Sequence, residues 1–446
     1  MSLADRPCLP IGKEQIRART GGSREHGREH GNPNDALDLL TKHREVLSRS
    51  FVPVIEAALR HRGDITIRTR KVWNMPLLAA AVLIDRLDLV DRLLAEGVDP
   101  NAAGPYGWRA LMNAQSPEAV RRLIAAGAVV EASMASGLKQ PNRFQGRTAL
   151  IHTAEQGRRS VVRELLAVGA DPNTRDGFGQ NALMRAVFAG HTEIVQDLID
   201  GGTTIGLTEA AVLGDTAEVS ALLTAGADLP PEWLNEALWW AAGSDNAAVL
   251  ALLLDAGADI ATSRFDDGYT PLHRAAAALR RDGVSLLLSR GADIRIRDER
   301  GATALHYSAM RGKDGPAHAM EILLQAGADV DIDALDAQNR TPLHYCVARG
   351  DAVGTRLVLA YGASIEPLPA AGVDSTSPLF RSPLMIAIDF RKTAMVEQLL
   401  EAGADATDAL AWAQDREAHL SPLSHDPEFK QIFTLLTRYS VSLDAG

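Results

Sequence analysis

This sequence is poor in the residues that build disulfide frameworks, zinc sites and β-sheets. It has only two cysteines, Cys8 and Cys346, too few and too far apart in the chain for a disulfide framework or a zinc site. Aromatic residues make up 5% of the chain, and strand-forming runs are nearly absent. The shortage of cysteine favours a reducing compartment. The shortage of strand-forming runs favours an all-α fold.

Long apolar runs are absent as well. The longest, Met75–Ile84, is about half the length of a membrane-spanning helix. Residues 1–34 contain six arginines and lysines among glycine, proline, glutamate and histidine, with no apolar run long enough for the core of a signal peptide. We therefore expect residues 1–34 to be a disordered leader. We expect the protein to be soluble and cytoplasmic, without a membrane span, and leave open its delivery into another cell.

Net positive charge and catalytic motifs are also missing. The formal net charge is -11, whereas a nucleic-acid binder normally needs a basic face to displace counterions. The chain has no complete P-loop, no G-x-S-x-G and no paired-cysteine zinc pattern. These observations predict no nucleic-acid partner, no cofactor and no catalytic residue, although a local basic patch remains compatible with the charge.

One repeated unit organises the rest of the chain, and its clearest copy is residues 268–293. The unit opens with TPLH at 270–273 and closes with Gly-Ala-Asp. Thr270 suits a helix cap, and Pro271 suits the first helical turn, where its missing N–H is no loss. Apolar residues before Gly291 form the stripe of a second, antiparallel helix, which the glycine ends in a left-handed conformation.

This motif resembles the T-P-L-H-x-A signature of the ankyrin repeat, a unit of about 33 residues. The resemblance extends from about Val72 to Asp405 and implies one curved, all-α ankyrin-repeat solenoid. Its units would be helix-turn-helix pairs with β-hairpin-like fingers, and degenerate capping units would close both ends. The glycines that end the ten units are Gly97, Gly127, Gly169, Gly202, Gly226, Gly257, Gly291, Gly327, Gly362 and Gly403.

The spacing of these signals predicts four segments. They are the leader at 1–34, N-terminal capping helices at 35–70, about ten ankyrin-like repeats at 71–405 and C-terminal capping helices at 406–446. Prolines, glycines and long spacing predict inserted loops near 131–145 and 366–381. The unit that starts at Leu207 has no hairpin before it, so we expect fingers to be missing near 203–232.

Histidines and tryptophans on the first helices are more easily explained by structure than by chemistry. The resemblance implies that His273, His306 and His344 bond the backbone of the adjoining loop, since other units replace this histidine by leucine, isoleucine or methionine. Trp239 and Trp240 are adjacent on one helix. We expect one in the core, while the other can reach the concave face.

The fingers and the concave helix faces hold the aromatic and arginine residues that are enriched in binding hot spots. Arg300, Arg311, Arg340 and Arg349 occupy equivalent places in two successive repeats and predict a basic strip for an acidic surface. The alternative is a set of solvated charges paired with neighbouring acids. The candidate partner-binding residues are Tyr106, Trp108, Phe144, Arg147, Phe178, Phe188, Phe265, Tyr269, Arg300, Arg311, Arg340 and Arg349.

Three functional hypotheses follow. The first is a monomeric, non-enzymatic protein-protein interaction scaffold that binds a partner on its concave face. The alanine- and arginine-rich composition suggests a bacterial inhibitor, immunity protein or effector-type adaptor. The second is an enzyme or metal-dependent protein that uses the inserted loops or the leader, where His26 and His30 fit the H-x-x-E-H pattern. The third is a self-associating structural array.

Overall fold

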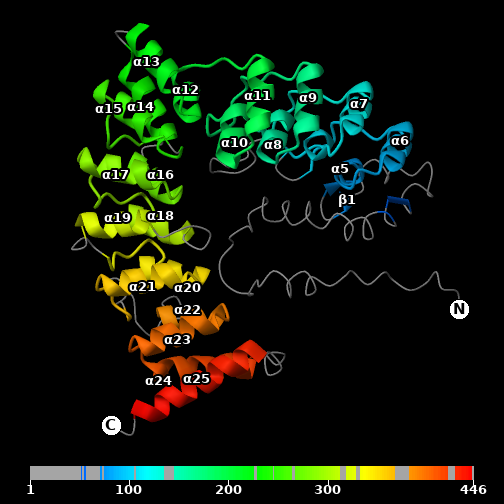
Figure 1. Cartoon of the computed structure of the whole chain (residues 1–446). Coiled ribbons are helices and arrows are strands. Elements are labelled where there is room, and N and C mark those ends of the chain that lie inside the picture. The colour runs from blue at the N-terminus through cyan, green and yellow to red at the C-terminus, as the bar shows by residue number, and fades with distance from the viewer. Residues whose placement is uncertain are drawn as a thin grey trace, which may run out of the picture. The chain divides into compact units, whose positions relative to one another are not determined.

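A computed structural model describes residues 52, 55–56, 71–72 and 75–443, except for gaps at 105–106, 135–144, 226–228, 245, 264–266, 312–317, 328–331, 367–380 and 420–426 (Figure 1). The expected leader, most of the expected N-terminal cap and most of the two expected inserted loops therefore lie outside the described residues. The chain divides into two compact units between Glu218 and Val219, and each unit is described separately.

The first unit is a row of antiparallel helix pairs. A two-residue antiparallel ladder precedes it, in which β1 (Lys71–Val72) pairs with β2 (Met75–Pro76). The first helix of the second pair is only a short 3-10 turn. The helices are α5 (Leu77–Leu83), α6 (Leu87–Ala95), η2 (Ala110–Asn113), α7 (Pro117–Ala125), α8 (Ala149–Glu155), α9 (Arg159–Ala167), α10 (Ala182–Ala189), α11 (Thr192–Asp200) and α12 (Leu207–Leu213). Helix α13 (Thr216–Ala225) crosses the boundary between the units.

The second unit continues the same construction. In Figure 1 the first helices of its pairs, such as α16, α18 and α20, stack in one column and the second helices in another. The helices are α14 (Pro231–Ala241), α15 (Ala247–Asp255), α16 (Pro271–Ala277), α17 (Arg281–Ser289), α18 (Ala304–Arg311), α19 (His318–Gly327), α20 (Pro342–Arg349), α21 (Ala352–Ala360), α22 (Pro383–Asp389), α23 (Thr393–Glu401), α24 (Ala406–His419) and α25 (Pro427–Leu443). The expected all-α repeat fold is confirmed.

The first helices begin where the sequence pattern places them. Thr148 accepts a hydrogen bond from the Ile151 N–H, and Asn181 accepts one from the Met184 N–H, so each cap satisfies a backbone donor that the helix leaves open. Helix α10 ends at Gly190, which has φ of 78°. This left-handed conformation favours glycine because glycine has no Cβ.

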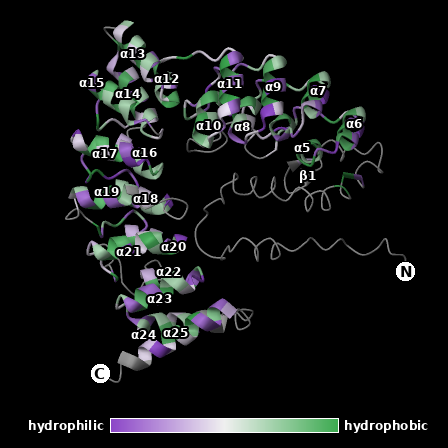
Figure 2. Cartoon of the chain, viewed as in Figure 1, coloured by the Kyte–Doolittle hydropathy of each residue, from purple (hydrophilic) through white to green (hydrophobic). Residues whose placement is uncertain are grey.

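Each helix pair buries its apolar side chains against its neighbours, so the core runs along the row of repeats. On the first helices, Leu150 and Leu272 are 1% exposed, and on the second helices Leu123 and Leu287 are 0% exposed. Hydrophobic colouring runs along the helices of both units in Figure 2. Because no repeat can bury these residues alone, the stability of each repeat depends on the adjacent repeats.

Candidate functional site

An aspartate anchors each well-described finger to the first helix that follows it. Asp298 Oδ1 accepts the backbone N–H groups of Arg300 at 3.0 Å and Ala302 at 2.8 Å. The Tyr307 hydroxyl donates to Oδ2 of the same aspartate at 2.5 Å. Asp336 and Tyr345 repeat this arrangement, and Arg185 replaces the tyrosine opposite Asp176. These bonds hold the tip of each finger in a set position over its helix.

Neighbouring fingers are joined through their backbones. In the second unit, the Glu299 N–H donates to Asp267 O at 2.7 Å, and the Ala337 N–H donates to Arg300 O at 2.7 Å. In the first unit, the Gly177 N–H donates to Gln145 O at 2.6 Å. These bonds join three successive fingers of the second unit and two of the first.

The three motif histidines have the structural role predicted for them. His344 Nδ1 accepts the Thr341 N–H at 3.0 Å, so the proton lies on Nε2, which donates to Arg381 O at 2.9 Å. His273 and His306 make the same pair of bonds to their own caps and to the next repeat. Burial lowers the pKa of all three, that of His344 to about 4. Both nitrogens are used, so none of these rings can shuttle protons.

Tyr269 is half-buried at the centre of an aromatic cluster in the second unit. Its ring packs edge-on against Tyr307, with centroids 4.8 Å apart, and against Trp239 at 5.9 Å. Burial raises the pKa of Tyr269 to about 12. Both tryptophans are in the core, and neither reaches the concave face, the alternative left open for one of them. Trp239 is 5% exposed and Trp240 2%, and the Arg274 guanidinium lies 4.3 Å from the centroid of each ring.

Two candidates of the first unit are buried, contrary to the exposed places predicted for them. Arg147 is 1% exposed because its guanidinium turns inward to Glu155 at 2.6 Å. Arg185 connects Glu155, at 3.3 Å, with Asp176, at 2.5 Å. Burial lowers the pKa of the Arg147 guanidinium. The carboxylates of Glu155 and Asp176 compensate for this desolvation.

Trp108 is the other buried candidate, at 7% exposed. Its indole N–H donates to Asn113 Oδ1 at 2.8 Å, and its ring packs edge-on against His152. The short η2 turn places these groups together. Phe178 and Phe188 are half-buried, while Tyr106, Phe144 and Phe265 lie outside the described residues.

The four arginines of the basic strip differ in what their side chains contact. Arg340 is engaged by its own finger. It lies 3.3 Å from Asp336, donates to Gln338 at 2.5 Å and stacks 4.5 Å above the centroid of the Tyr345 ring. Arg300, Arg311 and Arg349 are exposed. Within the part of the chain that the structure describes, the side chains of Arg300 and Arg311 have no hydrogen bond or ion pair. The alternative of internally paired charges therefore holds for Arg340.

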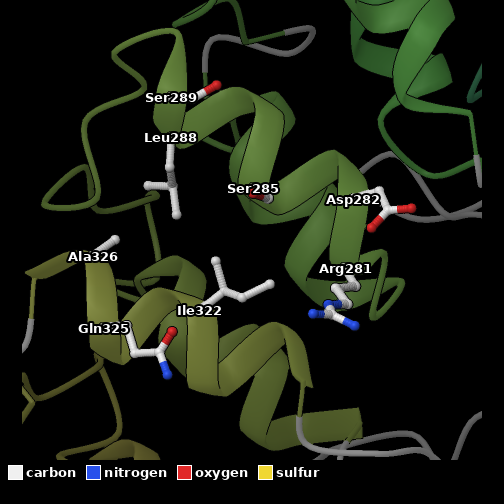
Figure 3. Close-up of a pocket in the computed structure, with 8 residues that line it drawn as sticks. All are labelled: Arg281, Asp282, Ser285, Leu288, Ser289, Ile322, Gln325 and Ala326. Carbon is white, nitrogen blue, oxygen red and sulfur yellow. The ribbon is translucent and has the colours of Figure 1, made fainter.

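A hollow of about 580 Å³ lies on the side of the second helices, between α17 and α19 (Figure 3). Leu288 and Ile322 point toward each other across it. Its residues are Arg281, Asp282, Ser285, Leu288, Ser289, Ile322, Gln325 and Ala326.

The described residues contain neither a metal-type cluster nor a membrane-spanning helix. Nowhere in the described ranges do three or more histidine, cysteine, aspartate or glutamate side chains gather as a metal site would require. None of the described helices combines the length and apolar character needed to cross a bilayer. His26 and His30, on which the metal-dependent hypothesis rests, lie outside the described residues.

Comparison with known proteins identifies the family. The sequence profile described as ankyrin repeats (3 copies) matches residues 77–176, 118–209, 207–298 and 284–368, which together span more than half of the chain. This chain belongs to the ankyrin-repeat family. The resemblance read from the TPLH motif is therefore confirmed. The finger aspartates, the motif histidines and the buried leucines described above are the internal framework of its ankyrin repeats.

Curated relatives share parts of this ankyrin-repeat chain. It is 27% identical to the E3 ubiquitin-protein ligase KEG of Arabidopsis thaliana, over 56% of the chain and 17% of that protein. It is 28% identical to the NF-kappa-B inhibitor delta of Mus musculus, over 50% of the chain and 69% of that protein. It is 37% identical to the ankyrin repeat and SOCS box protein 16 of Homo sapiens, over 27% of each. The chain thus spans less than a third of the length of the KEG ligase and of the SOCS box protein. The family and these relatives support a protein-interaction scaffold.

Proposed function

We propose that this ankyrin-repeat protein is a non-enzymatic, monomeric scaffold that binds an acidic protein partner on the finger and first-helix face of its second unit. One observation carries the proposal. The polar groups that build the face have partners within the fold, whereas Arg300 and Arg311 are exposed and no described residue pairs with their side chains. The side chains of Arg300 and Arg311 take no part in holding the fold together, so a ligand can bind them.

Charge favours an acidic partner. The chain as a whole has a net charge of -11, so a local group of exposed arginines runs against its overall balance. A planar guanidinium can bind a carboxylate through two parallel hydrogen bonds. Opposite charges across an interface also raise the rate of association and discriminate against other partners.

The fixed geometry of the fingers lowers the cost of binding. Arg300 lies at a finger tip whose backbone is held by Asp298 at 3.0 Å and by the Ala337 N–H at 2.7 Å. A surface that is already ordered loses less conformational entropy when a partner docks. The same rigidity supports a binding role over a catalytic one, since the motif histidines are fully occupied in holding adjacent repeats together.

The biological role proposed with this surface is that of an inhibitor or adaptor. One relative is named as an inhibitor, the NF-kappa-B inhibitor delta. Two others are named as a ubiquitin ligase and a SOCS box protein. A bacterial immunity or effector-type role is suggested only by the alanine- and arginine-rich composition.

The test is partner capture from native lysate by the protein and by a charge-reversed variant. We expect Arg311→Glu with Arg349→Glu to lose the captured protein, most clearly at low salt, because exposed ion pairs are screened as ionic strength rises. Arg356→Glu is the matched control, since Arg356 is also exposed but lies on the second helix α21. Circular dichroism checks that each fold is unchanged. Undiminished capture by the double variant at both salt concentrations would show that this face is not the site.

A further inference from the structure

The first helices α18, α20 and α22 end with three equivalent, solvent-exposed side chains. Arg311, Arg349 and Phe390 each stand eight residues after the Thr or Ser that precedes its helix. Both arginines are exposed, and Phe390 is 46% exposed, one of the few large apolar side chains on the described surface. We call these three residues the helix-end row. An exposed phenylalanine beside two exposed arginines combines an apolar contact with two carboxylate sites.

The helix-end row is continuous in space. Helix α18 packs against α20, and α20 packs against α22, as the column in Figure 1 also shows. At the turn after α20, a Cβ added to Gly350 would lie 3.3 Å from Lys392 Cδ, so the turns of these two repeats touch. Packed helices have axes roughly 8–10 Å apart. The three side chains are therefore repeated along the row at about that interval.

The charge of the row is almost entirely positive. Asp389, next to Phe390, is already neutralised by Arg381 at 2.6 Å and accepts the Trp412 indole N–H at 3.3 Å. Lys392 adds a cation at the same turn. A ligand that crosses the row thus meets two guanidinium groups and then an aromatic ring.

An extended backbone can match this interval in only one common conformation. A β-strand rises about 3.3 Å per residue, so three residues cover about 10 Å, but successive side chains alternate between faces and residues i and i+3 point to opposite sides. A polyproline II helix has three residues per turn and rises about 3.1 Å per residue. Its residues i, i+3 and i+6 therefore point to one side, about 9 Å apart.

We infer that the helix-end row binds an acidic segment in the polyproline II conformation, with Asp or Glu at i and i+3 and an apolar side chain at i+6, read in either chain direction. This inference rests on the proposed function and adds the register and conformation of the partner. The carboxylates at i and i+3 pair with Arg311 and Arg349. The apolar side chain at i+6 covers Phe390.

The test uses fluorescein-labelled synthetic peptides and fluorescence anisotropy with the full chain. The probes are Gly-Glu-Pro-Pro-Glu-Pro-Pro-Leu-Gly and the reversed order Gly-Leu-Pro-Pro-Glu-Pro-Pro-Glu-Gly. The control Gly-Glu-Glu-Pro-Pro-Pro-Pro-Leu-Gly has the same composition but places the two acids side by side. We expect at least one in-register probe to bind about tenfold or more tightly than the control, a difference of about 1.4 kcal/mol.

Matched variants assign the binding to the row. Phe390→Ala and Arg311→Gln should each weaken the in-register probe several-fold and leave the control peptide little changed. Val353→Ala is the apolar control, because Val353 is 55% exposed on α21, and Arg356→Gln is the charge control on the same helix. The inference would be overturned if all three peptides bound equally, or if none bound up to about millimolar concentration. It would also be overturned if Phe390→Ala bound the in-register probe as tightly as the unchanged protein. If Arg311→Glu with Arg349→Glu still abolished partner capture in that case, the proposed function would stand and only the register would be wrong.

Discussion

The Asn181 side-chain amide donates to Glu209 Oε1 at 3.1 Å, and this bond joins helices α10 and α12 of two successive repeats. Glu209 lies in α12, which begins at Leu207, seven residues after α11 ends at Asp200. Its carboxylate also pairs with Arg175 and accepts the Gly206 N–H at 3.3 Å. A buried carboxylate therefore connects this repeat to the preceding one, whereas the motif histidines connect their repeats to the next one.

We expect Glu209→Ala to destabilise the first unit by about 1–3 kcal/mol, because the buried Asn181 amide would lose an acceptor. Urea unfolding followed by circular dichroism measures the change. Glu193→Ala is the matched control, since the Glu193 side chain is 73% exposed and pairs only with the partly exposed Arg159. Its effect should stay within about 0.5 kcal/mol. Equal stability of both variants would mean that Glu209 does not join the repeats.

Leu287→Ala should cost about 2–5 kcal/mol, since Leu287 on α17 is 0% exposed and its removal leaves a cavity between repeats. Hydrogen exchange should show the loss of protection first in the repeats next to α17, because each repeat is stabilised mainly by its neighbours. The adjacent Leu288 is only half-buried, so Leu288→Ala should cost less. Uniform loss of protection across both units would contradict this local dependence.

Stability should fall as the pH drops from about 6.5 toward 4. Burial lowers the pKa of His152, His273, His306 and His344 below the ordinary value of 6.5, that of His344 to about 4. In this range the unfolded chain binds protons that the folded histidines do not, so acid favours unfolding. The histidine contribution is fully present above pH 6.5 and is lost as the pH falls through the folded pKa values.

Urea midpoints between pH 8 and pH 4 measure this dependence. His344→Met should make it shallower, and methionine is a fitting replacement because Met184 occupies the same place in another repeat. An unchanged slope in this variant would show that His344 does not contribute to it.

Limited proteolysis should cut early between Gly202 and Trp233. The boundary between the two compact units falls inside α13, and Val219 is the only buried residue of that helix. Helices with few buried side chains open locally at low cost in free energy. Mass spectrometry of the first fragments locates the cuts. Early cleavage confined to other parts of the chain, with this region left intact, would refute the prediction.

The sequence by itself determined the elements that depend on local signals. Thr or Ser caps, prolines in the first turn and glycines in the left-handed conformation act within one repeat, so the TPLH motif predicted the helix starts and the family. The motif histidines were also predictable, because the resemblance implies their bonds to the backbone of the adjoining loop. All of these signals lie within a few residues of the structure that they specify.

The tertiary structure decided which polar side chains are left for a partner. Arg147 and Arg340 are both arginines on fingers, but Arg147 turns inward to Glu155 and Arg340 stacks on Tyr345, and nothing in their own positions indicates this difference. Glu209 and Phe390 gain their importance from groups that neighbouring repeats bring beside them. Arg147 is buried where Glu155 of its own repeat and Asp176 of the next repeat supply carboxylates to compensate for its desolvation. That supply depends on how the repeats stack, so it becomes visible only when the chain is folded.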